Sequence, residues 1–390
     1  MAPDIRAAVV PEERRSTVNR FLRTDRAANI FAGCLVLVVA AVAVVLATGR
    51  PDAHPAAVPP SPSPSPREPA LRTFAPQHLR VGAAVDVKAL NTHEAYRKVL
   101  AREFSAVTAE SAMKWGQLEP RRGQYDWASS DRLVEFAVAN GQSVYGHTLV
   151  WHTDLPAWLP RDGSREELRE LLREHITTVV SRYRGKVWAW DVVNEVLADD
   201  GSMRDTVWLR ELGPDYVADA FRWAHAADPQ AVLFINDYGA EGRGAKADAL
   251  YRLVGRLRAA GVPVHGVGFQ AHLRADTMPP GMEQNLGRFA KAGLRLAVTE
   301  LDVRVRLPVT EKKLEQQAGV YRRVLQMCLD QPACVSFTVW GFTDAFSWIP
   351  GYHRGYGAAC LYDSGFAAKP AYTALRTLLT QRRVIASASP

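Results

Sequence analysis

Two glutamates stand where they could act together on one substrate. Glu195 ends the segment WDVVNE, and Glu300 lies within VTELDV. Two carboxyl groups in opposite protonation states can protonate a leaving oxygen and place negative charge beside the carbon that it leaves, which is the chemistry of glycosidic bond cleavage. The alternative is that both glutamates are structural acids held in salt bridges.

Polar residues close to these glutamates could support the same chemistry. On a strand, residues two apart share a face, so Asp302 is expected to point the same way as Glu300, and His272 the same way as Gln270. A histidine between two carboxylates can fix the charge of one of them. Asn194 offers an amide to a sugar hydroxyl.

Alternating strands and helices are expected to position these residues. After residue 70, short apolar runs recur, and amphipathic stretches such as 164–185 and 310–328 separate them. Eight alternations in about 310 residues predict an α/β fold, a (β/α)8 TIM barrel, rather than an open sheet. The strands are expected over residues 79–86, 104–110, 143–151, 187–195, 231–238, 264–273, 294–303 and 335–344.

Almost every predicted strand ends in polar residues. In a TIM barrel the carboxyl ends of the strands form the active site, and so many polar groups on one face must build a site or bear a large desolvation cost. The residues concerned are Glu110, His147, Asn194, Glu195, Asn236, Asp237, Tyr238, Gln270, His272, Glu300, Asp302, Trp340 and Asp344.

The N-terminal region differs in composition from the rest of the chain. Residues 28–48 carry no charge and are just long enough to cross a bilayer as a signal anchor. Arginines are concentrated in residues 1–27, which predicts a basic cytoplasmic tail and an exported C-terminal part. The protein is then expected at the extracellular face of the cell membrane, as a single-pass protein. A cleaved signal peptide, giving a secreted protein, is the alternative.

A spacer rich in proline and serine follows the apolar segment. Alternating Ser-Pro in residues 49–70 cannot form a helix or a sheet ladder and favours an extended linker. Residues 71–390 are then expected to form the catalytic domain.

The overall charge and the known phosphate motifs exclude other classes of protein. The net charge of +7 is scattered along the chain and does not form the basic patch that nucleic-acid binding requires. Neither GxGxxG nor GxxxxGK[ST] occurs. Four histidines with Asp237 could suggest a metal-dependent hydrolase, but HExxH is absent. We therefore expect no cofactor, no metal and no nucleic-acid partner, and a monomeric chain.

Two cysteines could form a disulfide. Five residues separate Cys328 from Cys334, and such a short loop can close if the two Cα atoms come within about 7 Å. Export would permit the bond. Two unlinked thiols in the core are the alternative.

The motifs around the two glutamates resemble the catalytic signatures of family 10 glycoside hydrolases, the retaining endo-β-1,4-xylanases. The resemblance covers about residues 76–382. It rests on WDVVNE and TELD together with matching segments at 107–127, 145–159, 234–241, 266–273, 338–348 and 369–372. The cysteine pair also matches a disulfide of many bacterial members.

The resemblance implies a role for each matching residue. Glu195 would be the acid/base and Glu300 the nucleophile of xylan hydrolysis, with His272 and Asp302 holding Glu300 and Gln270 on the acid/base side. Substrate, either xylan or xylo-oligosaccharides, would bind between polar and aromatic side chains. On the glycone side these would be Glu110, Lys114, His147, Trp151 and Asn194, with Trp340 and Trp348 as aromatic walls and Tyr238 on the aglycone side.

Two positions depart from the family pattern. Ser111 stands where the family usually has Asn, and Asp154 where it usually has Gln. Both positions normally hydrogen-bond the second glycone sugar, so the departures put glycone recognition in doubt. Two alternatives therefore stay open: a related β-glycosidase acting on another β-1,4-polysaccharide, and a carbohydrate-binding surface protein with little turnover.

Overall fold

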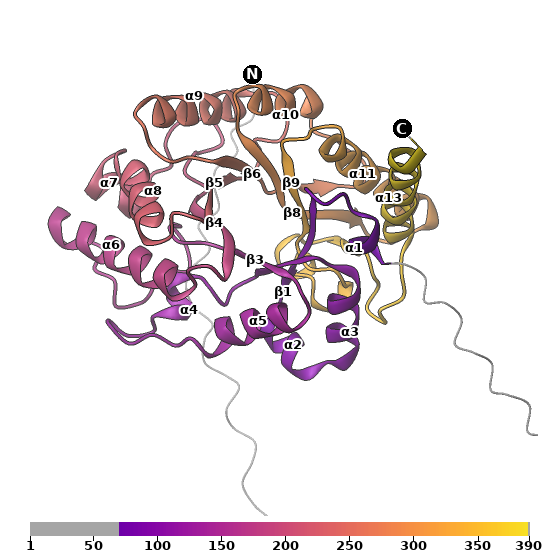
Figure 1. Ribbon diagram of the computed structural model, residues 1–390, viewed down its shortest axis with the longest axis horizontal. Helices are drawn as coiled ribbons and strands as arrows, with labels where there is room; N and C mark the ends of the chain where they lie inside the picture. The colour runs from indigo at the N-terminus through magenta and orange to yellow at the C-terminus, as the bar shows by residue number, and fades with distance from the viewer. Residues whose placement is uncertain (1–69, 389–390) are drawn as a thin grey trace, which may run out of the picture. The chain divides into compact units, whose positions relative to one another are not determined.

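A computed structural model describes residues 70–388 of the 390-residue chain. Eight parallel strands form a closed barrel, and helices surround it (Figure 1). The barrel strands are β1 (Arg80–Val85), β2 (Ala106–Ala109), β3 (Ser143–Gly146), β4 (Val187–Asn194), β5 (Val232–Asp237), β6 (Gly266–Phe269), β8 (Arg295–Arg306) and β9 (Cys334–Val339).

The order of the strands follows the sequence, and the first strand closes the barrel against the last. Gly82 pairs with Ala106 of β2 on one side and with Thr338 of β9 on the other, both in parallel register. Two short strands, β7 (His272–Arg274) and β10 (Tyr356–Gly357), add to the outer part of β8. The predicted (β/α)8 TIM barrel is therefore confirmed.

Amphipathic helices cover the outside of the strands. In α6 (Arg165–Arg182), Ser164 caps the first turn by accepting a hydrogen bond from the main-chain N–H of Glu167, and the apolar stripe from Leu168 to Val180 is buried. The other helices are α1 (Leu71–Phe74), α2 (Val87–Thr92), α3 (Glu94–Glu103), α4 (Trp115–Leu118), α5 (Ala128–Ala139), α7 (Val207–Leu212), α8 (Tyr216–Ala227), α9 (Ala245–Ala259), α10 (Met282–Lys291), α11 (Glu311–Leu329), α12 (Ile349–Tyr352), α13 (Pro370–Ala388) and the 3-10 helix η1 (Asp344–Phe346).

Three predicted strands extend well past the observed ones. The eighth, expected over 335–344, ends at Val339, so Trp340 follows the strand. The third, expected over 143–151, ends at Gly146, so Trp151 lies in a loop. The sixth, expected over 264–273, is broken between β6 and β7, where Ala271 has a φ of +59°. A residue in that conformation cannot continue a strand, so strand alternation does not relate Gln270 to His272.

The core has an inner and an outer part. Inside the barrel, Tyr145, Ala189, Phe234 and Ala297 form their own cluster, while a larger cluster fills the space between strands and helices. Cys328 and Cys334 form the predicted disulfide between the end of α11 and β9, with Cα atoms 5.3 Å apart.

The predicted basic tail, membrane anchor and most of the linker fall within residues 1–69 and lie outside the described residues. Among the helices of residues 70–388, none combines the length and the apolar character needed to span a bilayer.

Candidate active site

A cleft of about 810 Å³ lies over the carboxyl ends of the strands. Glu195 and Glu300 both line it, and so do most of the predicted polar and aromatic residues. The remaining predicted members of the lining are Lys114, His147, Trp151, Asn194, Tyr238, Gln270, His272, Trp340 and Trp348.

Glu300 is buried and held on both carboxylate oxygens. The amide of Asn236 donates to its Oε1 at 2.7 Å, and the Nε2 of His272 lies 3.2 Å from its Oε2. Thr299 in turn fixes Asn236 by donating to the amide oxygen at 2.7 Å. Gly268 makes room for that amide, because a Cβ there would lie 2.4 Å from the amide oxygen. This carboxylate is therefore fixed in one orientation.

His272 bridges two carboxylates, as the sequence predicted. Its Nδ1 lies 3.0 Å from Asp302, and the indole of Trp348 donates to the same Asp302 oxygen at 2.8 Å. Burial alone would lower the pKa of His272, but Asp302 and Glu300 outweigh it and raise this pKa to about 10. A protonated imidazole can donate to both carboxylates at once, which fixes Glu300 relative to Asp302.

Glu195 sits in a different environment at the end of β4. The amide of Gln270 donates to its Oε1 at 3.1 Å, and His152 lies 3.9 Å from its Oε2. The backbone of Glu195 has a φ of +58°, a conformation that is strained for a residue with a side chain and clusters at functional sites. The guanidinium of Arg204 donates to its main-chain carbonyl at 2.8 Å and holds this turn.

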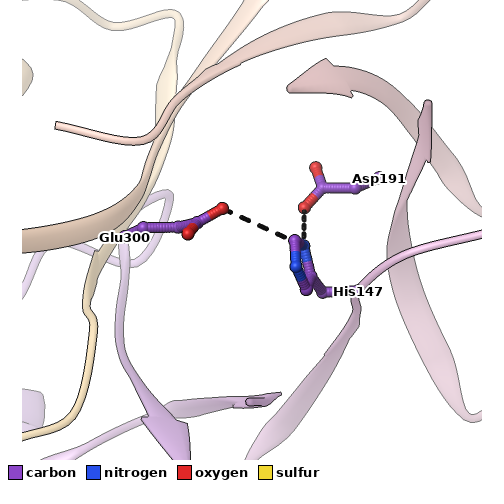
Figure 2. A group of neighbouring side chains, drawn as sticks. All are labelled: His147, Asp191 and Glu300. Atoms are coloured by element: carbon purple, nitrogen blue, oxygen red, sulfur yellow. Dashed lines mark hydrogen bonds and ion pairs between the residues drawn. The ribbon is translucent and has the colours of Figure 1, made fainter. Parts of the chain in front are cut away.

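A hydrogen-bonded group next to Glu300 has the composition of a metal site. Figure 2 shows His147 between Asp191 and Glu300, with Nδ1 at 2.9 Å and 4.0 Å from their oxygens. Burial lowers the pKa of His147 to about 4, so the ring is neutral near pH 7. Asp191 also accepts from the Tyr145 hydroxyl at 2.7 Å. Hydrogen bonds thus account for each member of this group, and they orient His147 toward the cleft.

Comparisons with known proteins agree with this arrangement. The sequence model described as glycosyl hydrolase family 10 matches residues 70–378. Endo-1,4-beta-xylanase B of Thermotoga neapolitana is 42% identical over 308 residues, which is 78% of this chain and 89% of that protein. Native xylanase 10B of Thermotoga maritima superposes with a TM-score of 0.79 at 42% identity and covers 81% of this chain and 99% of that one. Xylanase 10B of Thermotoga petrophila, whose structure was solved in complex with xylobiose, superposes with a TM-score of 0.78 at 41% identity. The match covers 80% of this chain and 98% of that one.

The chain belongs to glycoside hydrolase family 10. The family match starts at residue 70 and contains every residue that lines the cleft. The chain is therefore a glycoside hydrolase.

The two positions that depart from the family 10 pattern lie near Lys114. Asp154 is 3.7 Å from the ammonium group of Lys114, which also lies over the ring of Trp151. Ser111 and Glu110 line a separate hollow of about 350 Å³ rather than the main cleft. Burial raises the pKa of Glu110 to about 7. Asp154 therefore forms an ion pair with Lys114.

Tyr238 is held by two cations that the sequence reading did not connect with it. Arg204 donates to its hydroxyl at 2.9 Å, and the ammonium group of Lys246 lies 3.5 Å from the centre of its ring. Lys246 is buried in α9 and pairs with Asp237 at 3.0 Å. This pairing fixes the tyrosine ring as one wall of the cleft.

Asp344 and His265 stabilise the fold and do not line the cleft. Asp344 pairs with Lys369 at 2.9 Å and accepts from the main chain of Cys360, which makes it structural. His265 lies before β6, at the opposite end of the barrel, where it accepts from Leu233. His265 therefore does not join His147, His152 and His272, which all line the cleft.

The positive charge of His272 predicts that activity and stability are lost at high pH. Its folded pKa of about 10 is above its usual value of 6.5, so its contribution to stability is complete below about pH 6.5 and is lost as the pH rises through about 10. We expect kcat and the unfolding temperature to fall across that upper range. In Asp302→Asn the fall should begin at lower pH, because a carboxylate that raises this pKa is gone. The same alkaline limb in both proteins would contradict this account.

Proposed function

We propose that the protein is an endo-1,4-β-xylanase that hydrolyses internal xylosidic bonds of xylan with retention of anomeric configuration. The observation that carries the proposal is the pair of glutamates in one cleft with opposite surroundings. Glu300 accepts hydrogen bonds from Asn236 and His272, whereas Glu195 faces the neutral amide of Gln270. The relatives named xylanases above support the choice of substrate.

In the first step, Glu300 attacks the anomeric carbon while Glu195 gives its proton to the departing oxygen. The bond to the leaving sugar breaks as the bond to the Glu300 carboxylate forms, which yields a glycosyl-enzyme. Donation from Asn236 and His272 holds the attacking oxygens in place. In the second step, Glu195 takes a proton from water, which attacks the same carbon and releases Glu300.

The stereochemistry of the first product tests the mechanism. Two displacements at one carbon restore its configuration, so proton NMR during early hydrolysis of xylo-oligosaccharides should show the β anomer first. Parallel assays on xylan, β-1,4-glucan and β-1,4-mannan test the substrate. An α anomer as first product refutes the mechanism, and faster hydrolysis of glucan or mannan refutes the substrate.

Ser111 and Asp154 are expected to weaken binding of the second glycone sugar. Ser111 reaches less far than Asn, and Asp154 has no donor to offer while it pairs with Lys114. One missing hydrogen bond costs about 0.5–1.5 kcal/mol, so two imply roughly ten- to a hundredfold in kcat/KM. The double variant Ser111→Asn with Asp154→Gln should therefore raise kcat/KM on xylotriose and longer chains.

Aryl β-xylosides are the matched control for this variant, because they leave the second glycone subsite empty and should change little. A double variant that is unchanged or slower on xylan would mean that these residues suit another sugar. The substrate assignment would then move to another β-1,4-polysaccharide.

The sequence also supports a place at the outer face of the cell membrane, with residues 28–48 as an anchor and the rest of the chain exported. Full-length protein should then fractionate with membranes and have the mass of the complete chain. Protein found only in the culture medium, beginning near residue 50, would mean that the segment is a cleaved signal.

A further inference from the structure

Strand β8 carries a third polar residue on the face that bears Glu300 and Asp302. Alternate residues of a strand share a face, and Arg304 is the next in this row. In the register with β7, His272 lies opposite Asp302 and Arg274 lies opposite Arg304. Arg304 lines the cleft, as do Tyr352 and His353.

All the partners of Arg304 within residues 70–388 are neutral. Its Nη1 donates to the main-chain carbonyl of His272 at 3.2 Å, and its guanidinium lies 5.6 Å from the ring centre of Tyr356. No carboxylate of the described residues pairs with it. The nearest acid in its row, Asp302, binds His272 and Trp348 through Oδ2, and neither of its oxygens forms a hydrogen bond or ion pair with Arg304. Arg304 therefore brings a positive charge and unused donors to the wall of the cleft.

The neighbouring Arg274 shows the contrast. It lies over the same ring of Tyr356, at 5.8 Å, but pairs with Asp276 through two hydrogen bonds of 2.9 and 2.7 Å. Its charge is neutralised, and its side chain is not part of the cleft lining. The two arginines lie opposite each other on β7 and β8 and contact the same tyrosine ring. Of the two, only Arg304 has a charge that is free to bind a ligand in the cleft.

We infer that Arg304 binds a carboxylate on the polysaccharide, namely the carboxylate of a uronic-acid side group on xylan. This inference rests on the proposed function, because the xylan backbone itself is neutral and only a side group can carry the charge. A guanidinium presents parallel donors that match the two oxygens of a carboxylate. The cleft would then bind the acidic side group of xylan and not only leave room for it.

A pair of matched substrates tests the inference on the full-length protein. One is glucuronic-acid-bearing xylan, and the other is the same polymer after its carboxyl groups have been reduced to alcohols. The wild type should show a higher kcat/KM on the acidic polymer, and Arg304→Gln should lower the ratio of the two values about ten- to a hundredfold, the effect of one charge-assisted hydrogen bond. About 0.5 M salt should lower the wild-type ratio in the same direction.

Two further variants sharpen the result. Arg274→Gln should keep the wild-type ratio, because that charge is already paired. Arg304→Lys should keep part of the preference, because it retains charge but loses the paired donors. Equal losses on both polymers in Arg304→Gln would overturn the inference and leave Arg304 as a support for the backbone of His272. An equal rate of the wild type on both polymers would also overturn it, whereas no hydrolysis of either would overturn the proposed function.

Discussion

Replacing Glu300 by alanine is expected to lower kcat by roughly 10⁴-fold or more on every substrate. The variant loses the atom that attacks the anomeric carbon, and no other described carboxylate accepts the hydrogen bond from Asn236. The quality of the leaving group cannot compensate, because the missing bond is the one that forms. Initial rates on xylan and on an aryl β-xylobioside should therefore fall together.

Added azide provides a second readout for Glu300→Ala. The space left by the side chain can admit a small anion, which would attack in one displacement and give the α-glycosyl azide. Glu315→Ala removes an exposed glutamate of α11 and should behave as the wild type. Residual hydrolysis of the aryl glycoside within about tenfold of the wild type would show that Glu300 is not the nucleophile.

Much of the architecture could be predicted from the sequence because hydrophobic periodicity reports burial directly. All eight barrel strands lie within or beside their predicted ranges, and the row of Glu300 and Asp302 follows from the two-residue period of β8. The placement of His272 between those acids also holds. That placement succeeded even though its argument from a continuous strand was wrong, because the break at Ala271 still leaves His272 opposite Asp302.

Neighbours across strands could not be predicted, because they depend on register. Asn236 contacts Glu300 only through the alignment of β5, β6 and β8, which fixes how far each strand is displaced along its neighbour. The sequence placed Asn236 at a strand end but gave it no partner. Asp191 reads as an interior strand position, and its contact with His147 again depends on the pairing of two strands.

The pKa values of the buried histidines also could not be predicted from the sequence, because burial and neighbouring carboxylates act in opposite directions. Burial lowers the pKa of both His147 and His272, but only His272 has two carboxylates within hydrogen-bonding distance. Near pH 7 the His272 ring is therefore positively charged and the His147 ring neutral, although both lie in one cleft. Residue type alone predicts the same pKa for both. Lys246 is a similar case, since a lysine on an amphipathic helix reads as exposed but here is buried against Asp237.

Replacing Glu195 by alanine should separate substrates by leaving group, which no change at Glu300 should do. In xylan the leaving group is a sugar hydroxyl, which is poorly acidic and needs the proton from Glu195. Hydrolysis of xylan should therefore slow by about 10²- to 10⁴-fold. In a dinitrophenyl β-xylobioside the leaving group is a stable phenolate that needs no proton. This substrate should still form the glycosyl-enzyme at a near-normal rate. Gln270, which holds the Glu195 carboxylate, remains in the variant, so the subsite itself should persist.

The second step gives this prediction its signature. Glu195 also takes the proton from the attacking water, so its loss should slow release of the sugar more than its attachment when the leaving group is activated. The aryl substrate should then show a burst of phenolate equal to the enzyme concentration, followed by a slow phase, and intact-mass measurement should detect a glycosylated enzyme. Glu300→Ala should show neither. Equal losses on xylan and on the aryl glycoside, with no burst, would remove Glu195 from the role of acid and base, since a residue that only shapes the cleft has no reason to distinguish leaving groups.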